Sequence, residues 1–216
     1  MAAVATIHDV SKLFGRFAAL RHVSATLDAG RCYLLVGENG AGKSTLLRVL
    51  AGLLRPTLGT VRVLDQTAAE ARSHVGYMGH ATMLYDELTA RENLEYTVRL
   101  YTSYSDAGQS CLGADQALRM VGLDPELARP VGQYSQGMRQ RTSLARVLIS
   151  QPELLLLDEP FSNMDRASAE RMLALLAELR SAGRTIMLTT HQRELAEPMA
   201  DAVLTMHGGA LTMEAR

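Results

Sequence analysis

A glycine-bearing loop between an apolar strand and an apolar-periodic helix constrains this chain more than any other feature. The segment is RCYLLVGENGAGKSTLLRVLAGLLR, with a predicted strand over residues 32–36 and a helix that begins near Lys43. Its glycines permit backbone angles that other residues resist, so successive N–H groups can curl around phosphate oxygens at the positive end of the helix. A glycine-rich turn without a ligand is the alternative. The complete G-x-x-x-x-G-K-[ST] pattern, in its strand and helix context, favours phosphate binding within an α/β fold.

The side chains that follow the loop fit a nucleotide carrying Mg²⁺. Lys43 can reach the outer phosphates as a point charge, the hydroxyl of Ser44 is a hard ligand suited to Mg²⁺, and Thr45 is expected to touch a phosphate. The predicted nucleotide-binding residues of this segment are Gly37, Glu38, Asn39, Gly40, Ala41, Gly42, Lys43, Ser44 and Thr45.

A second segment, LLLLDEPFSNMD, places two carboxylates at the end of an apolar run. Four leucines at 154–157 predict a strand buried on both faces, yet the run ends in Asp158 and Glu159. Burying unpaired carboxylates is costly, so a cation, a bound ligand or water has to offset them. We expect Asp158 to hold the Mg²⁺ of the nucleotide and Glu159 to orient and deprotonate the attacking water. The two segments together predict hydrolysis of ATP.

Composition limits the remaining classes of function. The 216 residues are 47% hydrophobic and 21% charged, enough for one large domain with a real core. With 22 basic and 23 acidic residues the net charge is −1, so no global field favours nucleic acid, and we expect no nucleic-acid partner. Cys32 and Cys111 have no metal-ligand spacing. The N-terminus lacks a signal-peptide pattern and no run is long enough to span a membrane, so we expect a soluble chain in a reducing cytosol.

Four segments, GENGAGKST, YSQGMRQR, LLLLDEPFSNMD and LTTHQ, resemble in their order and spacing the nucleotide-binding subunit of ATP-binding cassette (ABC) transporters. The resemblance covers essentially the whole chain. It implies a single P-loop NTPase domain over residues 1–216, with a mixed-sheet core, an antiparallel β side sheet that includes VRVLD, and a helical lobe at about residues 81–135. Within that lobe, Thr89 to Glu92 is a capping box, and the chain ends in a predicted hairpin that turns at Gly208 and Gly209.

The resemblance also implies a head-to-tail dimer with a second copy of this chain or a homologous cassette. Each ATP would lie between the phosphate loop of one subunit and the signature motif of the other. Ser135, Gln136 and Gly137 would then act in trans. On residues alone, Ser135 and Gly137 immediately precede a helix and form an anion site, although an ordinary turn is the alternative.

Three further positions match residues with known roles in the family. His191, at the carboxyl end of a predicted strand, matches the switch histidine that contacts the γ-phosphate. Asp165 matches the aspartate of the loop that links the two active sites. Phe14 matches the aromatic residue that stacks on adenine, with a place in the core as the alternative.

One position departs from the family pattern. His80 stands where a glutamine usually contacts metal and water, and we expect it to contribute to catalysis through a water molecule or else only to shape the loop. The Gly-His pair, LYDELTARENL and LTTHQ resemble the ATP-binding subunit of the haem exporter family of cytochrome c maturation. Many members of that family have glutamine where this chain has Ala81.

The implied partner is an integral membrane permease, with this chain bound peripherally at the cytoplasmic face of the membrane. ATPase subunits of drug, lipid or ion exporters share many of the same sequence motifs, so a subunit of such an exporter is the alternative. A soluble ABC protein acting on ribosomes, DNA or metal clusters is a further alternative. A binding module without turnover is disfavoured because Lys43, Asp158, Glu159 and His191 are all present.

Overall fold

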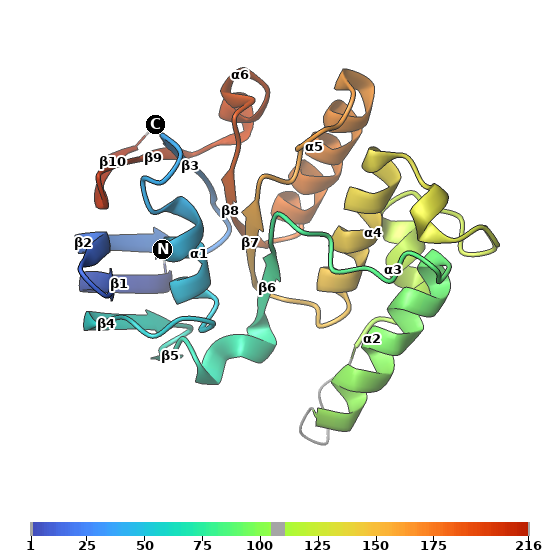
Figure 1. Ribbon diagram of the computed structural model, residues 1–216, viewed down its shortest axis with the longest axis horizontal. Coiled ribbons are helices and arrows are strands. Elements are labelled where there is room, and N and C mark those ends of the chain that lie inside the picture. Colours follow the sequence, from blue (N-terminus) through green and yellow to red (C-terminus); the bar gives the residue numbers. More distant parts are fainter. Residues whose placement is uncertain (1, 105–110, 216) are drawn as a thin grey trace.

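A six-stranded mixed sheet forms the centre of the computed structural model, which describes residues 2–104 and 111–215. The strand order is β10-β9-β3-β8-β7-β6, and every neighbouring pair is parallel except β9 with β10. These strands are β3 (Cys32–Gly37), β6 (Val75–Met78), β7 (Leu154–Asp158), β8 (Thr185–Thr189), β9 (Ala202–His207) and β10 (Ala210–Ala215). The parallel strands end on one edge, where the loops that carry the sequence motifs emerge (Figure 1).

A second, antiparallel sheet packs beside the first. Its order is β2-β1-β4-β5, formed by β1 (Ala3–Phe14), β2 (Phe17–Asp28), β4 (Leu58–Val63) and β5 (Gln66–Thr67). Helix α1 (Lys43–Leu50) lies between the two sheets (Figure 1), and its apolar side shares one buried cluster with both of them. The prediction that VRVLD belongs to an antiparallel side sheet is confirmed, as is the C-terminal hairpin between β9 and β10.

The other face of the mixed sheet is covered by helices. Helices α4 and α5 lie against it, and α2 and α3 lie farther from the sheet beside α4 (Figure 1). The helices are α2 (Ala90–Tyr104), α3 (Ala114–Met120), α4 (Gln136–Leu148), α5 (Arg166–Ser181) and α6 (Arg193–Ala196), with short 3-10 helices at Glu70–His74, Val131–Gln133 and Glu197–Met199. Among the described residues, no helix has the length and apolar character needed to cross a bilayer.

The capping box predicted at the start of α2 is confirmed. The backbone N–H of Thr89 donates to a carboxylate oxygen of Glu92 at 2.8 Å, and the N–H of Glu92 donates to the Thr89 hydroxyl at 3.2 Å. These two bonds satisfy donors that a helix start otherwise leaves open. Helices α2 and α3 lie within the stretch expected to form a helical lobe, and their apolar residues join the same buried cluster as α4, α5 and one face of the mixed sheet.

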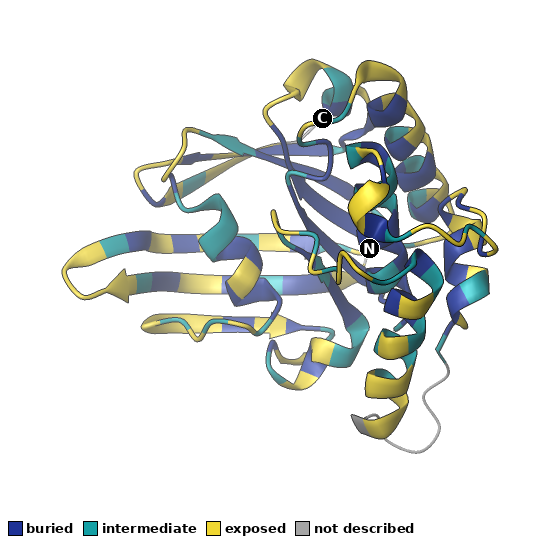
Figure 2. Ribbon diagram, turned by 45° about the vertical axis from the view of Figure 1, so that its right-hand side comes forward, coloured by how far each residue is buried: buried dark blue, intermediate teal, exposed yellow. Residues whose placement is uncertain are grey.

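The four leucines of β7 pack the mixed sheet against neighbouring elements on both of its faces. All five residues of β7 are buried (Figure 2), because Leu155 and Leu157 face the helices while Leu154 and Leu156 face α1 and the antiparallel sheet. A parallel strand covered on both faces has no solvent side, so it carries no polar alternation. Asp158 is the last residue of β7, so packing on both faces of the strand fixes its position at the edge of the sheet.

Candidate nucleotide-binding site

The phosphate-binding loop keeps its shape because glycine occupies two crowded positions. Gly42 caps α1 in a left-handed conformation, with φ of 108°, and a Cβ atom there would lie 2.4 Å from the carbonyl oxygen of Ala19. At Gly37 the same added atom would lie 2.2 Å from the carbonyl oxygen of Met206. Since neither backbone oxygen can withdraw easily, any side chain at these positions would displace the loop from the adjacent strands.

Lys43, the first residue of α1, is directed back over this loop. Its ammonium group donates to the carbonyl oxygens of Gly37 at 2.7 Å and Glu38 at 3.0 Å. A lysine held in this way places a compact positive charge beside the backbone N–H groups at the start of α1, where phosphate oxygens are favoured.

The loop opens into a cavity of about 290 Å³. The structure brings together here residues from the β1–β2 hairpin, the phosphate-binding loop, the end of β7 and the segment after β8. The lining residues are Phe14, Phe17, Ala19, Asn39, Gly40, Gly42, Lys43, Ser44, Thr45, Asp158, Glu159 and His191. The remaining loop residues of the prediction, Gly37, Glu38 and Ala41, contribute backbone to the same turn but do not line the cavity.

Parallel pairing of β7 with β8 places Thr189 beside the two carboxylates, with Asp158 opposite Thr189 in the register. The Thr189 hydroxyl donates to Oδ1 of Asp158 at 2.9 Å and accepts the backbone N–H of Glu159, also at 2.9 Å. Glu159 itself adopts a left-handed backbone conformation, with φ of 57°, which turns the chain sharply at the end of the strand. One buried hydroxyl group thus fixes both acidic positions.

The donor set around Asp158 fits a magnesium ion. Asp158 is only 5% exposed, and within residues 2–104 and 111–215 it forms no ion pair with a basic side chain. Its carboxylate lines the same cavity as the hydroxyl of Ser44, and hard oxygen ligands of this kind are those that Mg²⁺ prefers. A buried carboxylate without a protein cation is consistent with a charge supplied by a ligand.

Glu159 and His191 face each other across the mouth of the cavity. The backbone N–H of His191 donates to Oε2 of Glu159 at 3.1 Å, and the imidazole Nε2 lies 3.5 Å from Oε1. Oε1 is shielded from solvent and has no hydrogen-bond partner among the described residues. The 3.5 Å approach of the imidazole is too long to serve as a strong hydrogen bond, so in this structure Oε1 has an unused acceptor site beside the cavity.

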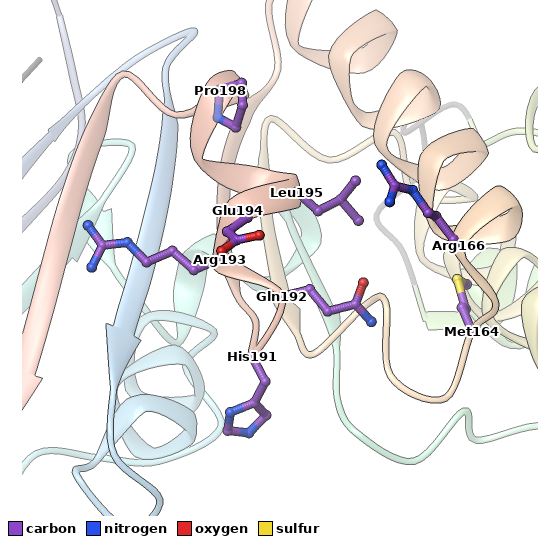
Figure 3. Close-up of a pocket in the computed structure, with 8 residues that line it drawn as sticks. All are labelled: Met164, Arg166, His191, Gln192, Arg193, Glu194, Leu195 and Pro198. Atoms are coloured by element: carbon purple, nitrogen blue, oxygen red, sulfur yellow. The ribbon is translucent and has the colours of Figure 1, made fainter.

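A wider cavity of about 970 Å³ begins on the other side of His191 (Figure 3). Gln192 points from the His191 segment toward Met164 and Arg166 at the start of α5 (Figure 3). This cavity contains no residue of the phosphate-binding loop. His191 therefore stands between the nucleotide cavity and the loop that carries Asp165.

The signature segment lies outside the nucleotide cavity of its own chain. Ser135 caps α4 and accepts the backbone N–H of Met138 at 3.3 Å. The prediction that Gly137 precedes the helix is wrong, because α4 begins at Gln136 and Gly137 belongs to its first turn. At Gly137 an added Cβ atom would lie 2.8 Å from the side chain of Ser168, so this glycine allows α4 to approach α5 closely.

Asp165 is the N-cap of α5. Its carboxylate accepts the backbone N–H of Ser168 at 2.9 Å and the Ser168 hydroxyl at 2.8 Å. The hydrogen bond from the Ser168 backbone, more than any other contact, lowers the pKa of Asp165. Ser168 thus contacts both the capping aspartate of α5 and Gly137 in the first turn of α4. The signature segment and the loop that carries Asp165 therefore lie next to each other.

The lining of the nucleotide cavity lacks His80, which was predicted to belong to the site, and includes Phe17, which was not. His80 is exposed in the loop after β6 and does not line the cavity. Phe14 is 49% exposed, so its alternative place in the core is wrong. Phe17 pairs with Phe14 across the turn of the β1–β2 hairpin, and FGRF, two aromatic residues around a glycine turn, is the sequence signal for it. The role of Thr189 had no such signal.

Comparison with known protein families matches residues 20–162 to the family described as ABC transporter. The chain belongs to the ABC transporter family. This cassette is 35% identical over 196 residues to the ABC transporter ATP-binding protein NatA of Bacillus subtilis, covering 88% of this chain and 79% of that protein. It is 32% identical over 219 residues to the bacitracin transport ATP-binding protein BcrA of Bacillus licheniformis, covering 99% and 70%.

Solved ABC cassettes share the fold over almost the whole chain. A dimeric, post-hydrolysis structure of the cassette MJ0796 bound to ADP and phosphate superposes with a TM-score of 0.84 at 25% identity, covering 98% of each chain. The predicted cassette architecture, with its mixed core, antiparallel side sheet and helices, is therefore confirmed, and the chain is an ABC ATPase. Neither relative is named for haem export, and BcrA is named for bacitracin transport.

Proposed function

We propose that this ABC cassette hydrolyses ATP as a head-to-tail dimer at the cytoplasmic face of a membrane, and that it thereby drives a separate permease that exports a cargo. The observation that supports this most is the single cavity that joins Lys43, Asp158, Glu159 and His191 at the carboxyl ends of β3, β7 and β8. Positioning and charge stabilisation of this kind supply most of the catalysis of phosphoryl transfer.

Each side chain of the cavity has a role in the proposal. Mg²⁺, held by Ser44 and Asp158, would neutralise charge on the phosphates when the nucleotide is bound. Lys43 binds the outer phosphates, and the carboxylate of Glu159, which lines the same cavity, accepts the proton of the attacking water. His191 contacts the γ-phosphate and holds Glu159 through its backbone N–H. Phe14 and Phe17 offer exposed ring faces to the adenine base.

The signature segment completes the cavity of a second subunit in this proposal. Ser135, Gln136 and Gly137 lie outside the cavity of their own chain, and the cap of α4 presents backbone N–H groups to an anion. Asp165 lies beside the cavity that also borders His191, which suits a loop linking two active sites. The solved MJ0796 cassette, itself described as dimeric, supports this arrangement by likeness.

The permease is proposed to dock on an apolar surface beside His80. Four large apolar side chains are exposed on the loop after β6 and on α2: Met83, Tyr85, Tyr96 and Leu100. The rings of Tyr85 and Tyr96 meet edge to face, with centroids 5.5 Å apart, so the surface holds a defined shape. The exposed pair of Tyr85 and Tyr96 favours a protein partner, because contiguous apolar surface marks interaction sites.

The first test replaces the proposed base. Glu159→Gln removes the proton acceptor but retains the shape of the side chain, so turnover should fall by about 100-fold or more and ATP should remain bound. Sedimentation of this variant with ATP and Mg²⁺ should then detect a dimer, whereas the Lys43→Ala control should stay monomeric. A Glu159→Gln variant that remains monomeric with ATP would contradict the head-to-tail mechanism.

The cargo separates two candidates. The Gly79–His80 pair and LTTHQ support haem export, whereas relatives named for bacitracin transport and fluoroquinolone export support export of other compounds. The test is to tag this chain in its native cell, solubilise membranes gently and identify the co-purifying membrane protein by mass spectrometry, with haem absorbance measured on the complex. A haem-handling partner supports haem export, and an unrelated permease excludes it. Recovery of this chain only in the soluble fraction would contradict a permease partner.

A further inference from the structure

A cavity of about 180 Å³ lies between β6, α2 and α4, and it shares no lining residue with the nucleotide cavity. Its lining comes from three separate parts of the chain, which meet here because α4 packs against β6 and α2 packs beside α4. The lining residues are Val75, Gly76, Tyr77, Thr97, Tyr101, Arg146, Val147, Ile149 and Ser150.

Arg146, in the last turn of α4, is the only charged residue among the described residues of this lining. Within residues 2–104 and 111–215 its guanidinium group makes no hydrogen bond and no ion pair, and its Nε is shielded from solvent without a partner. Burial lowers the pKa of Arg146, and no carboxylate offsets that effect. A half-buried cation in this state is costly, because a desolvated charge normally has a counter-charge or several acceptors.

The groups that the structure describes around this cavity do not supply that counter-charge. The described part of the lining contains no Asp or Glu. The carbonyl end of α4 contributes roughly half an elementary charge at its last turn, which offsets the guanidinium only in part. The hydroxyl of Ser150 makes a single long hydrogen bond, 3.4 Å to the carbonyl oxygen of Val147, so it can turn to donate to another acceptor in the cavity.

We propose that this cavity is a binding site for a small oxyanion of the size of inorganic phosphate, held by the guanidinium of Arg146 and the hydroxyl of Ser150. The planar fork of an arginine matches two oxygens of such an anion. The volume of about 180 Å³ is below that of ordinary cofactor sites, so a whole nucleotide is excluded. A bound anion would neutralise the guanidinium of Arg146 where α4 meets β6 and so stabilise the fold. The inference does not depend on the proposed transport function.

The test measures how far inorganic phosphate, compared with chloride at equal ionic strength, raises the melting temperature. The measurements use a Lys43→Ala background, which weakens phosphate binding at the nucleotide loop. A ligand that binds only the folded state raises stability with its concentration, so the melting temperature should increase and saturate. Adding Arg146→Gln should abolish the increase. Adding Arg166→Gln, which removes an arginine whose side chain is 92% exposed outside the cavity, should retain it.

A second variant makes the test independent of any general loss of stability caused by Arg146→Gln. Thr97→Leu leaves Arg146 in place but fills part of the cavity, so it should also abolish the phosphate-dependent increase. An increase that persists unchanged in either Arg146→Gln or Thr97→Leu would overturn the proposal. So would the absence of any increase in the Lys43→Ala background itself.

Discussion

At the scale of single residues, the hydroxyl of Thr189 positions both acidic residues of the nucleotide cavity. It is fully buried, donates to Asp158 and accepts the backbone N–H of Glu159. Thr189→Val keeps the shape but leaves that N–H without a partner, which should lower the free energy of unfolding by about 1–3 kcal/mol. Urea denaturation measures this loss.

The same substitution should lower kcat more than it raises KM, because it displaces Glu159 without touching the phosphate-binding loop. Thr189→Ser retains the hydroxyl and should restore both stability and turnover. If Thr189→Val had wild-type kcat and stability, Thr189 would have no positioning role.

The two cysteines should differ sharply in reactivity. Burial raises the pKa of Cys32 to about 12, while Cys111 is partly exposed. The thiolate is the reactive form, and at pH 8 a thiol with such a pKa is ionised in only about one molecule in ten thousand. Maleimide should therefore label the folded protein once, at Cys111, and the urea-unfolded protein twice. The folded Cys111→Ser variant should remain unlabelled up to about pH 10, and fast labelling of it would contradict the burial of Cys32.

At the scale of elements, the hairpin between β4 and β5 is strained. Its two turn residues, Leu64 and Asp65, both have left-handed conformations, with φ of 50° and 58°. Such two-residue turns favour glycine because a side chain is disfavoured there. Leu64 packs against the core and is needed, but Asp65 is exposed.

Asp65→Gly should therefore raise the free energy of unfolding by up to about 1 kcal/mol, because relief of the left-handed conformation, about 1–2 kcal/mol, exceeds the entropic cost of glycine in the unfolded chain, about 0.5–1 kcal/mol. Thermal unfolding measures it. Asp65→Ala removes the same carboxylate but keeps a Cβ atom, so this control should not stabilise the protein. Equal effects of the two substitutions would mean that the charge of Asp65, rather than its backbone, determines stability at the turn.

The same scale shows which parts of the structure could be predicted from the sequence. The phosphate-binding loop, the leucine strand and the capping box could be predicted, because each depends on residues that are close together in the sequence. Thr189 and Asp158 are 31 positions apart, and their contact depends on the parallel register of β7 and β8. The tight approach of Gly137 to Ser168 similarly depends on how α4 and α5 pack. Contacts that tertiary packing creates left no local signal.

At the scale of the whole molecule, the separation between Ser135 and the nucleotide cavity of its own chain leads to a decisive test. If Ser135 acts in trans, a dimer formed from Lys43→Ala and Ser135→Arg subunits contains one site with both defects and one intact site. Each variant alone should be inactive in ATP hydrolysis. An equal mixture should recover about one quarter of wild-type turnover, since half of the dimers are mixed and each has one of two sites.

A site built within one chain gives the opposite result, because every subunit in the mixture then carries a defective site. Varying the proportion of the two variants at constant total protein should give maximal turnover at equal amounts, where mixed dimers are most numerous. Mixing Lys43→Ala with Glu159→Gln is the control: both defects lie on the phosphate-loop side of the cavity, so no mixed dimer regains an intact site. Recovery in the first mixture and none in the second would assign the signature helix to the partner's nucleotide. Inactivity in both would contradict the action of Ser135 in trans.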